Sequence, residues 1–202
     1  VMKQHGELGE AVLLLNEQAT LENIRNAVLK SAAKLTQPGD TVFIYWSGHG
    51  GRCADDNGDE KDGFDEFLVP YDGRTDDVDS VRRTMLLDDA FGHWVQELDG
   101  RKLIVVLDTC HSGGQATMEK SLRDLSKGLS LPGVQAGGDF DFLDGEFVRT
   151  KDIGQKDTAI LASSQASQVS FERPEGDLSV MTYFLVDLLS KANGAVTHRQ
   201  AF

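Results

Sequence analysis

The chain has 202 residues and a formal net charge of −13, from 33 acidic and 20 basic side chains. This negative balance argues against nucleic acid and anionic membranes as partners, and it favours cations, either metal ions or basic substrate side chains. Hydrophobic residues make up 40% of the chain, which suffices for the core of one domain, and no apolar run could span a bilayer. Two cysteines do not form a disulfide framework, so we expect a reducing, cytoplasmic location.

The first third of the chain predicts a strand, a helix and a second strand. Residues 11–15 (AVLLL) indicate a short buried strand, and Thr20 is a candidate N-cap for the helix that follows. Residues 41–46 are apolar and β-branched, which favours a buried strand. The apolar stripe of the predicted helix consists of Leu21, Ile24, Val28 and Leu35.

The middle of the chain begins with an acidic, glycine-rich segment, residues 50–79, that has almost no helical period. We expect a long loop there, with a hairpin around residues 67–69. Residues 87–98 then predict a helix that ends at Asp99, and residues 102–108 predict a strand. The apolar face of that helix consists of Leu87, Phe91, Val95 and Leu98.

The last third divides into an irregular part and an ordered part. Residues 115–156 are rich in Gly, Asp, Lys and Ser, which predicts a linker or insertion. Residues 158–162 predict a strand, and residues 179–191 predict a helix. The predicted buried face of that helix consists of Met181, Phe184, Leu185 and Leu188. The alternation of strands and helices along the chain predicts an α/β fold with a mostly parallel sheet.

Two of the predicted strands end in residues that can carry chemistry. One run, VFIYWSGHG, places His49 between two glycines, and the other, LIVVLDTCHSGG, places Cys110 two residues after Asp108. Because the carboxyl ends of parallel strands meet at one edge of a sheet, we expect the imidazole and the thiol to lie close together. A thiol needs a base or an electropositive setting to become a good nucleophile. The pair is a candidate catalytic dyad; the alternative is a buried structural cysteine and an ordinary loop histidine.

These motifs resemble those of the metacaspases, which are caspase-type cysteine peptidases of clan CD (peptidase family C14). SGHG at residues 47–50 matches the histidine motif, and DTCHSG at residues 108–113 matches the nucleophile motif. Residues 58–65 resemble the acidic segment between the two motifs, and residues 160–172 resemble part of the small-subunit region. The resemblance implies a caspase-type three-layer α/β sandwich, with a mostly parallel central sheet flanked by helices.

The resemblance also implies how the single catalytic domain is organised. Residues 1–114 correspond to the large-subunit-like region, residues 115–156 to a linker or insertion, and residues 157–202 to the small-subunit-like region. Members of the family begin with an apolar strand ahead of the segment that matches residues 1–9. We therefore expect that family segments are missing at both ends of the printed chain.

The resemblance assigns roles in peptide hydrolysis to the strand ends. Cys110 would attack the scissile carbonyl and His49 would protonate the leaving amine. The backbone N–H groups of Gly50 and Cys110 would hold the oxyanion. In such sites each donor lowers the activation free energy by about 3–4 kcal/mol.

The expected substrate specificity depends on Asp108. A carboxylate at the end of a buried strand is costly unless it meets a cation, and a substrate Arg or Lys could supply one. The resemblance implies cleavage after Arg or Lys, with Ser47 lining the pocket and Glu172 as a second pocket acid. The alternatives are that Asp108 caps local turn amides and that Glu172 is a solvated surface acid.

The acidic segments suggest a calcium site. Asp65, Asp88 and Asp89 match three of the four aspartates that coordinate calcium in activated members of the family, and Thr117 occupies the fourth position. Calcium would then act as an activator and would not be required for the chemistry; the alternative is a merely solvated acidic loop. Residues 55–66 partly imitate an EF-hand, but Glu60 occupies the position that needs glycine, which excludes that motif.

The sequence thus favours a cysteine endopeptidase that cleaves proteins or peptides after Arg or Lys. Two alternatives stay open: a calcium-binding regulatory module, and a catalytically silent scaffold with a caspase fold. An enzyme of this specificity could also process itself within or beside the predicted linker. The basic residues available there are Lys120, Arg123, Lys127, Arg149, Lys151 and Lys156.

Overall fold

The computed structural model describes residues 9–58, 60, 62–111, 134–135, 142, 158–162, 173 and 178–191. Within these ranges, only the backbone is described for Cys110, His111, Val134, Gln135 and Thr158. The predicted linker at 115–156 therefore lies almost entirely outside the described residues. Thr117 and Glu172 also lie outside them. None of the helices in the described part combines the length and the apolar character needed to cross a membrane.

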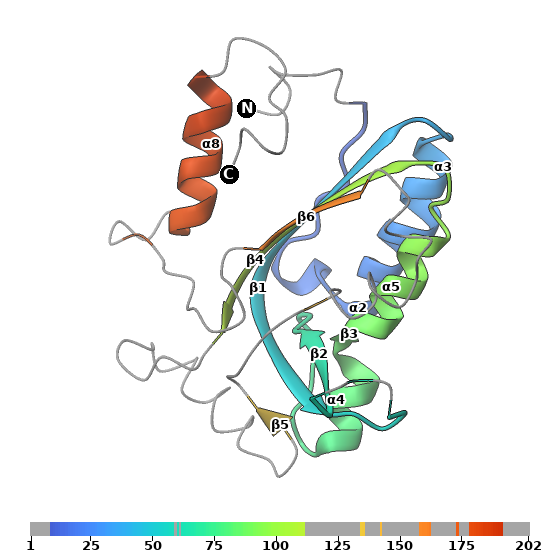
Figure 1. Cartoon of the computed structure of the whole chain (residues 1–202), viewed down its shortest axis with the longest axis vertical. Coiled ribbons are helices and arrows are strands. Elements are labelled where there is room, and N and C mark those ends of the chain that lie inside the picture. The colour runs from blue at the N-terminus through green and yellow to red at the C-terminus, as the bar shows by residue number, and fades with distance from the viewer. Residues whose placement is uncertain are drawn as a thin grey trace.

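A mixed β-sheet forms the centre of the molecule (Figure 1). Its strands are ordered β3-β2-β1-β4-β6, and β5 pairs with β1. β4 runs parallel to both β1 and β6, while β2 runs antiparallel to β1 and β3 antiparallel to β2. The strands are β1 (Thr41–Ala54), β2 (Phe64–Leu68), β3 (Leu86–Leu87), β4 (Lys102–His111), β5 (Val134–Gln135) and β6 (Thr158–Ala162).

The central strands form where the sequence predicts them, and two of them are longer than predicted. Val105 and Val106 of β4 are both fully buried, although successive residues of a strand face opposite sides, so β4 is covered on both faces. β1 continues beyond the predicted 41–46 because β2 pairs with its second half, from Gly50 opposite Leu68 onward.

The expectation of a long loop over residues 50–79 is therefore wrong in part, because β2 covers residues 67 and 68 of the expected hairpin, whose turn lies earlier, between Ala54 and Phe64. The first part of that segment is a β1–β2 hairpin, and its end begins a short helix, α4 (Val78–Thr84). Asp77 caps α4, since its Oδ1 accepts a hydrogen bond from the Ser80 N–H at 2.6 Å. The FDEFL sequence of β2 does not alternate between apolar and polar residues, so the extent of this strand could not be predicted from periodicity.

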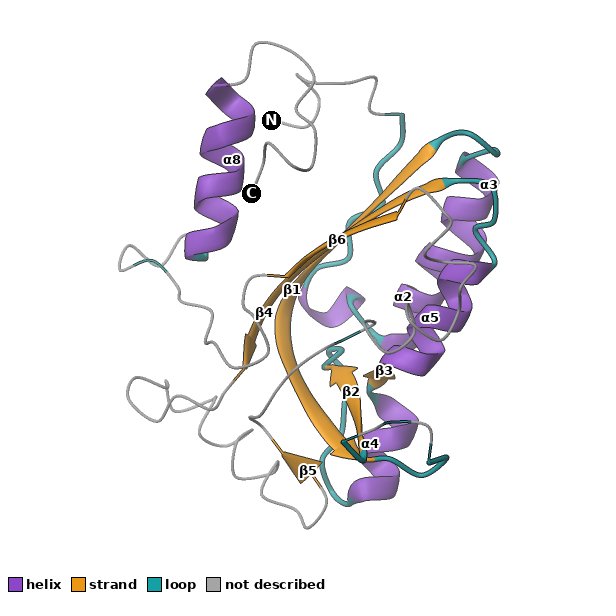
Figure 2. Ribbon diagram, viewed as in Figure 1, coloured by secondary structure: helices purple, strands orange, loops and turns teal. Residues whose placement is uncertain are grey.

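One face of the sheet is covered by helices from two parts of the chain (Figure 2). The predicted first helix is present as α2 (Leu21–Asn26), a π-helical stretch (Ala27–Ala32) and α3 (Ala33–Leu35), and the predicted second helix as α5 (Asp88–Gln96). The Thr20 Oγ1 accepts a hydrogen bond from the Asn23 N–H at 3.2 Å, which is the expected N-cap. Leu35 departs from the predicted stripe, because its side chain is 41% exposed.

Residues 11–15 do not form the predicted strand. They are irregular and lead into a 3-10 turn (Asn16–Gln18), with Val12, Leu13 and Leu15 exposed and Leu14 packed against the core. An apolar run becomes a strand only where a neighbouring strand offers hydrogen-bond partners, and this segment lies outside the described sheet.

The other face of the sheet meets a helix from the C-terminal part of the chain, α8 (Val180–Lys191) (Figure 1). It matches the predicted helix at 179–191, but Phe184 is 62% exposed and the buried residue of α8 is Thr182. Helices thus lie on both sides of the sheet, as the predicted three-layer arrangement requires. The described contacts between α8 and the sheet are made by hydroxyls at the start of the helix, and they belong to the candidate site.

The core between the sheet and the helices predicts a clear difference between two phenylalanine substitutions. Phe91 of α5 is 2% exposed and its ring lies 5.8 Å from that of Phe142, so Phe91→Ala should lower the free energy of unfolding by about 3–5 kcal/mol. Phe184→Ala, at an exposed position, should change it by less than about 0.5 kcal/mol. Urea unfolding followed by circular dichroism measures both values, and equal effects would contradict the described packing.

Candidate active site

The parallel pairing of β1 with β4 sets the geometry of the candidate site. Ser47 of β1 lies opposite Asp108 of β4, and His49 lies opposite Cys110. Neighbouring strands are about 4.8 Å apart, so this register brings the histidine and cysteine backbones to adjacent positions. Gly50, the next residue of β1, lies between Leu68 of β2 and His111 of β4. The structure thus brings together the two motif residues, and their catalytic roles stay predictions.

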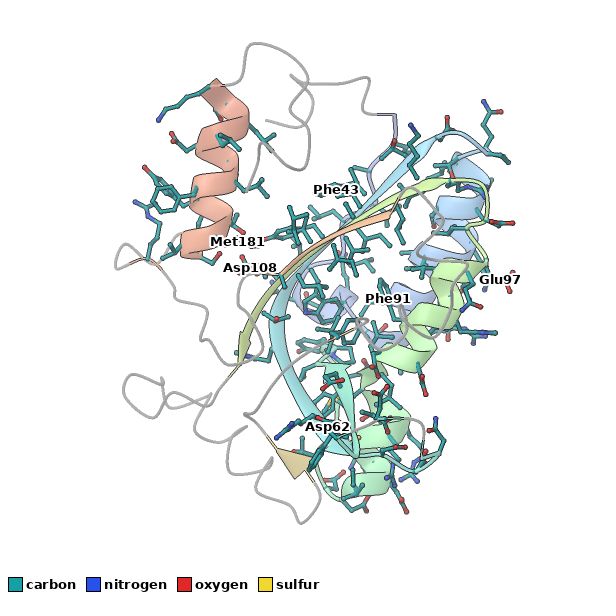
Figure 3. All side chains as sticks on the ribbon, viewed as in Figure 1. Phe43, Asp62, Phe91, Glu97, Asp108 and Met181 are labelled. Atoms are coloured by element: carbon teal, nitrogen blue, oxygen red, sulfur yellow. The ribbon has the colours of Figure 1, made fainter. Side chains whose placement is uncertain are left out.

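Asp108 is buried, with 5% of its surface exposed, and its carboxylate is held by three hydroxyl groups. The Asp108 Oδ2 accepts hydrogen bonds from Tyr45 at 3.1 Å and from Ser179 and Thr182 at 2.5 Å each. Figure 3 shows Asp108 directed from the sheet toward the end of α8 that carries Met181. The described partners of Asp108 come from β1 and α8, which disfavours the alternative that this carboxylate caps the amides of its own turn.

Helix α8 and strand β1 supply these hydroxyls from local geometry. Ser179 immediately precedes α8, and its Oγ accepts a hydrogen bond from the Thr182 N–H at 3.0 Å, the usual pattern of an N-cap. Tyr45 precedes Ser47 by two residues, so both lie on the same face of β1. Burial, reinforced by the charge of Asp108, raises the pKa of Tyr45, so the phenol keeps the proton that it donates.

Sequence reasoning missed Tyr45, Ser179 and Thr182 as parts of the site. Tyr45 could have been found, because a period of two along β1 links it to Ser47 and His49. The two α8 hydroxyls could not, since no local pattern tells which strand a helix end will meet. Of the predicted pocket residues, Ser47 is exposed on β1 beside Asp108, and Glu172 lies outside the described residues.

A second group of carboxylates lies at the far end of β1. Asp65 and Glu66 of β2 and Asp88 of α5 are all buried. Burial, followed by the charge of Glu66, raises the pKa of Asp88 to about 8, and burial, followed by the charge of Asp55, raises that of Asp65 to about 7. The Oδ1 of Asp88 is buried without a hydrogen-bond partner in the described part of the chain.

The structure groups the predicted metal residues with two further aspartates. Oxygens of Asp55, Asp56 and Asp65 lie within 4.8 Å of one another. The sequence prediction considered Asp55 only as the first position of the excluded EF-hand motif, and it did not name Asp56. Asp89 is near both predicted partners, because its charge contributes to the raised pKa values of Asp65 and Asp88. The charges of Glu66, Asp89 and Glu60 act on Asp88, whose Oδ1 has no described partner. Carboxylates grouped in this way fit a hard divalent cation such as Ca²⁺, which takes six to eight oxygen ligands.

Among the described residues, Arg82 of α4 is a cation that contacts this group. Its guanidinium donates to the Ala54 carbonyl oxygen at 2.6 Å and lies 3.4 Å from the Asp56 carboxylate. It also lowers the pKa of Asp65, but this effect is outweighed by burial and by the neighbouring aspartates. Arg82 therefore does not offset the effects that raise the pKa of Asp65.

Comparison with known proteins identifies the family. The caspase-domain model of peptidase family C14 matches residues 7–201 of the chain. Metacaspase-1B of Aspergillus niger is 36% identical over 110 residues, which cover 52% of this chain and 24% of that protein. Metacaspase-2 of Arabidopsis thaliana is 42% identical over 80 residues, or 38% of this chain and 17% of that protein. The chain thus spans about a quarter or less of these relatives.

A solved structure supports the fold independently. The crystal structure of a Geobacter sulfurreducens protein superposes with a TM-score of 0.57 at 22% identity, covering 94% of this chain and 69% of that one. The central sheet with helices on both faces agrees with this likeness. The chain therefore has a caspase-type α/β fold and belongs to the caspase-domain family of C14 peptidases.

Proposed function

We propose that this chain is a metacaspase-like cysteine endopeptidase that cleaves peptide bonds after Arg or Lys. The observation that carries the proposal is the β1–β4 register, in which His49 lies opposite Cys110 and a buried Asp108 precedes Cys110 by two residues. A base, a nucleophile and an anionic recognition group on two adjacent strands are what peptide hydrolysis after a basic residue needs. Its relatives are named metacaspases, which agrees with this assignment.

In the proposed reaction His49 takes the proton of the Cys110 thiol, and the thiolate attacks the scissile carbonyl carbon. The new C–S bond turns the carbonyl oxygen into an oxyanion, which the N–H groups of Gly50 and Cys110 would stabilise. As the C–N bond breaks, His49 returns its proton to the leaving amine. Water, deprotonated by His49, then hydrolyses the thioester and regenerates the thiol.

Asp108 would select the residue on the amino side of the cleaved bond. Its carboxylate is withdrawn from water, so a guanidinium or ammonium group that reaches it gains a charge-assisted hydrogen bond in a setting of low dielectric. Ser47 lies opposite Asp108 in the register and would add a hydroxyl to the same pocket. We keep Glu172 as a second pocket acid.

The acidic group at the far end of β1 fits the calcium that the family resemblance implies. Asp65, Asp88 and Asp89 would hold the ion, and Asp55 and Asp56 add oxygens next to Asp65. The ion would supply positive charge that neutralises buried carboxylates, and it takes no part in the thiol chemistry. Because the orphaned Asp88 oxygen favours cation binding by itself, a calcium-binding regulatory module is the second candidate function.

The proposed dyad makes a first prediction about the two cysteines. Cys110→Ala and His49→Ala should each abolish release of a fluorophore from a peptide that ends in Arg, and Cys110→Ala should also abolish self-cleavage fragments. Cys53→Ala is the matched control, because burial raises the pKa of Cys53 to about 12 and leaves that thiol unreactive. Equal turnover by the wild type and the Cys110 variant would overturn the peptidase assignment.

Recognition by Asp108 makes a second prediction. Asp108→Asn should lower kcat/KM for Arg and Lys peptides by roughly 100-fold, since the substrate cation loses a charged partner. Alkylation of Cys110 by the small, neutral reagent iodoacetamide should continue at the wild-type rate. Asp187→Asn, on the exposed side of α8, is the control. Unchanged kcat/KM in the Asp108 variant would remove this residue from the pocket.

The calcium assignment makes a third prediction, about stability and pH. The raised pKa of Asp88, about 8 against about 3.9 unfolded, means that the calcium-free fold loses stability as pH rises between these values. Asp88→Asn should therefore raise the melting temperature in EGTA at about pH 8, and it should remove most of the stabilisation that calcium gives the wild type.

Differential scanning fluorimetry with and without calcium provides this measurement. Asp76→Asn is the control, since Asp76 pairs with Arg74 at the exposed surface and should leave both melting temperatures unchanged. No calcium-dependent shift in the wild type would withdraw calcium from the proposal and leave the dyad standing. Calcium stabilisation without any peptide turnover would favour the regulatory module.

A further inference from the structure

The carboxylate of Asp108 is bound unevenly by the residues around it. All three described hydrogen bonds, from Tyr45, Ser179 and Thr182, end on Oδ2. Oδ1 accepts none from the described part of the chain. Two of the donors belong to the start of α8 and one to β1, so the three hydroxyls join a helix and a strand that are more than a hundred residues apart in sequence.

The protons of this cluster can be assigned from its contacts. The Ser179 Oγ accepts from the Thr182 N–H at 3.0 Å, so its own proton is available to Asp108. The oxygens of Tyr45 and Thr182 lie 2.7 Å apart, and each hydroxyl has one proton to give. With Asp108 ionised, these protons point at Oδ2 directly or through one another, and that oxygen has no capacity left for a further donor.

We propose that Tyr45, Ser179 and Thr182 are positioning residues that occupy Oδ2 of Asp108, so that a substrate cation is recognised through Oδ1 alone. This inference rests on the proposed role of Asp108 in substrate binding. Arg is favoured over Lys where its two parallel N–H groups can meet both oxygens of a carboxylate. A single available oxygen removes that advantage, so the pocket accepts Lys nearly as well as Arg.

The test measures binding, so that it does not depend on turnover. Cys110→Ala protein is titrated by calorimetry with two peptides that differ only in an Arg or Lys at the recognised position, with calcium present. We expect the two affinities to agree within a few-fold. Adding Thr182→Val, which keeps the shape and removes the hydroxyl, should free Oδ2 and raise the ratio of Arg to Lys affinity by roughly five- to tenfold.

Two further variants separate positioning from general damage to the pocket. Tyr45→Phe should raise the ratio in the same direction, and Thr182→Ser should restore the original ratio. Ser190→Ala is the matched control, because its hydroxyl lies on the same helix and donates only to the Val186 carbonyl in the described contacts. An unchanged Arg to Lys ratio in Thr182→Val and Tyr45→Phe overturns the inference, whatever the absolute affinities do.

Failure of the inference and failure of the proposed function give different results. If the Arg peptide binds and the wild type cleaves it, but the ratio does not respond to the hydroxyls, only the inference is wrong. If the Arg peptide neither binds to the Cys110→Ala protein nor is cleaved by the wild type, the proposed function is wrong and the inference falls with it.

Discussion

The parallel pairing of β1 with β4 is the constraint on which the candidate site depends. It places Ser47 opposite Asp108 and His49 opposite Cys110. A slip of one residue would set His49 against Thr109 and turn every side chain of one strand to the other face. Burial prevents that slip, because Val42 and Val105 pack against the helices on one face. The hydrophobic core therefore sets the position of the polar chemistry.

The buried carboxylates of the structure have two different kinds of surroundings. The buried carboxylate of Asp108 accepts hydrogen bonds from Tyr45 of β1 and from two hydroxyls at the start of α8, where the helix dipole also favours negative charge. In the described part of the chain no hydroxyl donates to Asp65 or Asp88, the Oδ1 of Asp88 has no partner, and burial raises the pKa values of both carboxyls. Burying a carboxylate is costly unless a partner offsets the cost, and a bound cation would do so for Asp65 and Asp88. The two environments thus suit two different ligands.

Much of the fold could be predicted from local patterns, and the failures share one cause. The strand at 158–162, the Thr20 cap and the helix around Phe91 follow from periodicity and capping, which are properties of neighbouring residues. Residues 11–15 have the composition of a strand but lie outside the described sheet, whereas β2 lacks the alternation of a half-exposed strand yet pairs with β1. Strand formation depends on a distant partner, which composition does not specify.

The same distinction between local patterns and distant contacts applies to the candidate site. The motifs with His49, Asp108 and Cys110 could be predicted because each motif ends an apolar run. The carboxyl ends of parallel strands lie at one edge of the sheet, where functional residues gather. The role of the Ser179 and Thr182 hydroxyls could not be predicted, because they contact Asp108 only as a result of where α8 lies relative to the sheet. A serine at a helix start has a sufficient local explanation as a cap, and nothing in the sequence indicates its second contact.

Strand β1 connects the two acidic environments, and this would give a bound calcium ion a physical route to the proposed dyad. Its end at Ala54 runs directly into Asp55 and Asp56, and Cys53 of β1 lies opposite Asp65 of β2. Repulsion among these carboxylates acts on the last β1–β2 pairs, and His49 lies only a few residues back along the same strand. A cation that neutralises the group would strengthen that pairing and hold the His49 backbone more firmly in its register with Cys110. Such an effect is one of positioning, transmitted through a single strand, and it needs no contact between the ion and the reacting atoms.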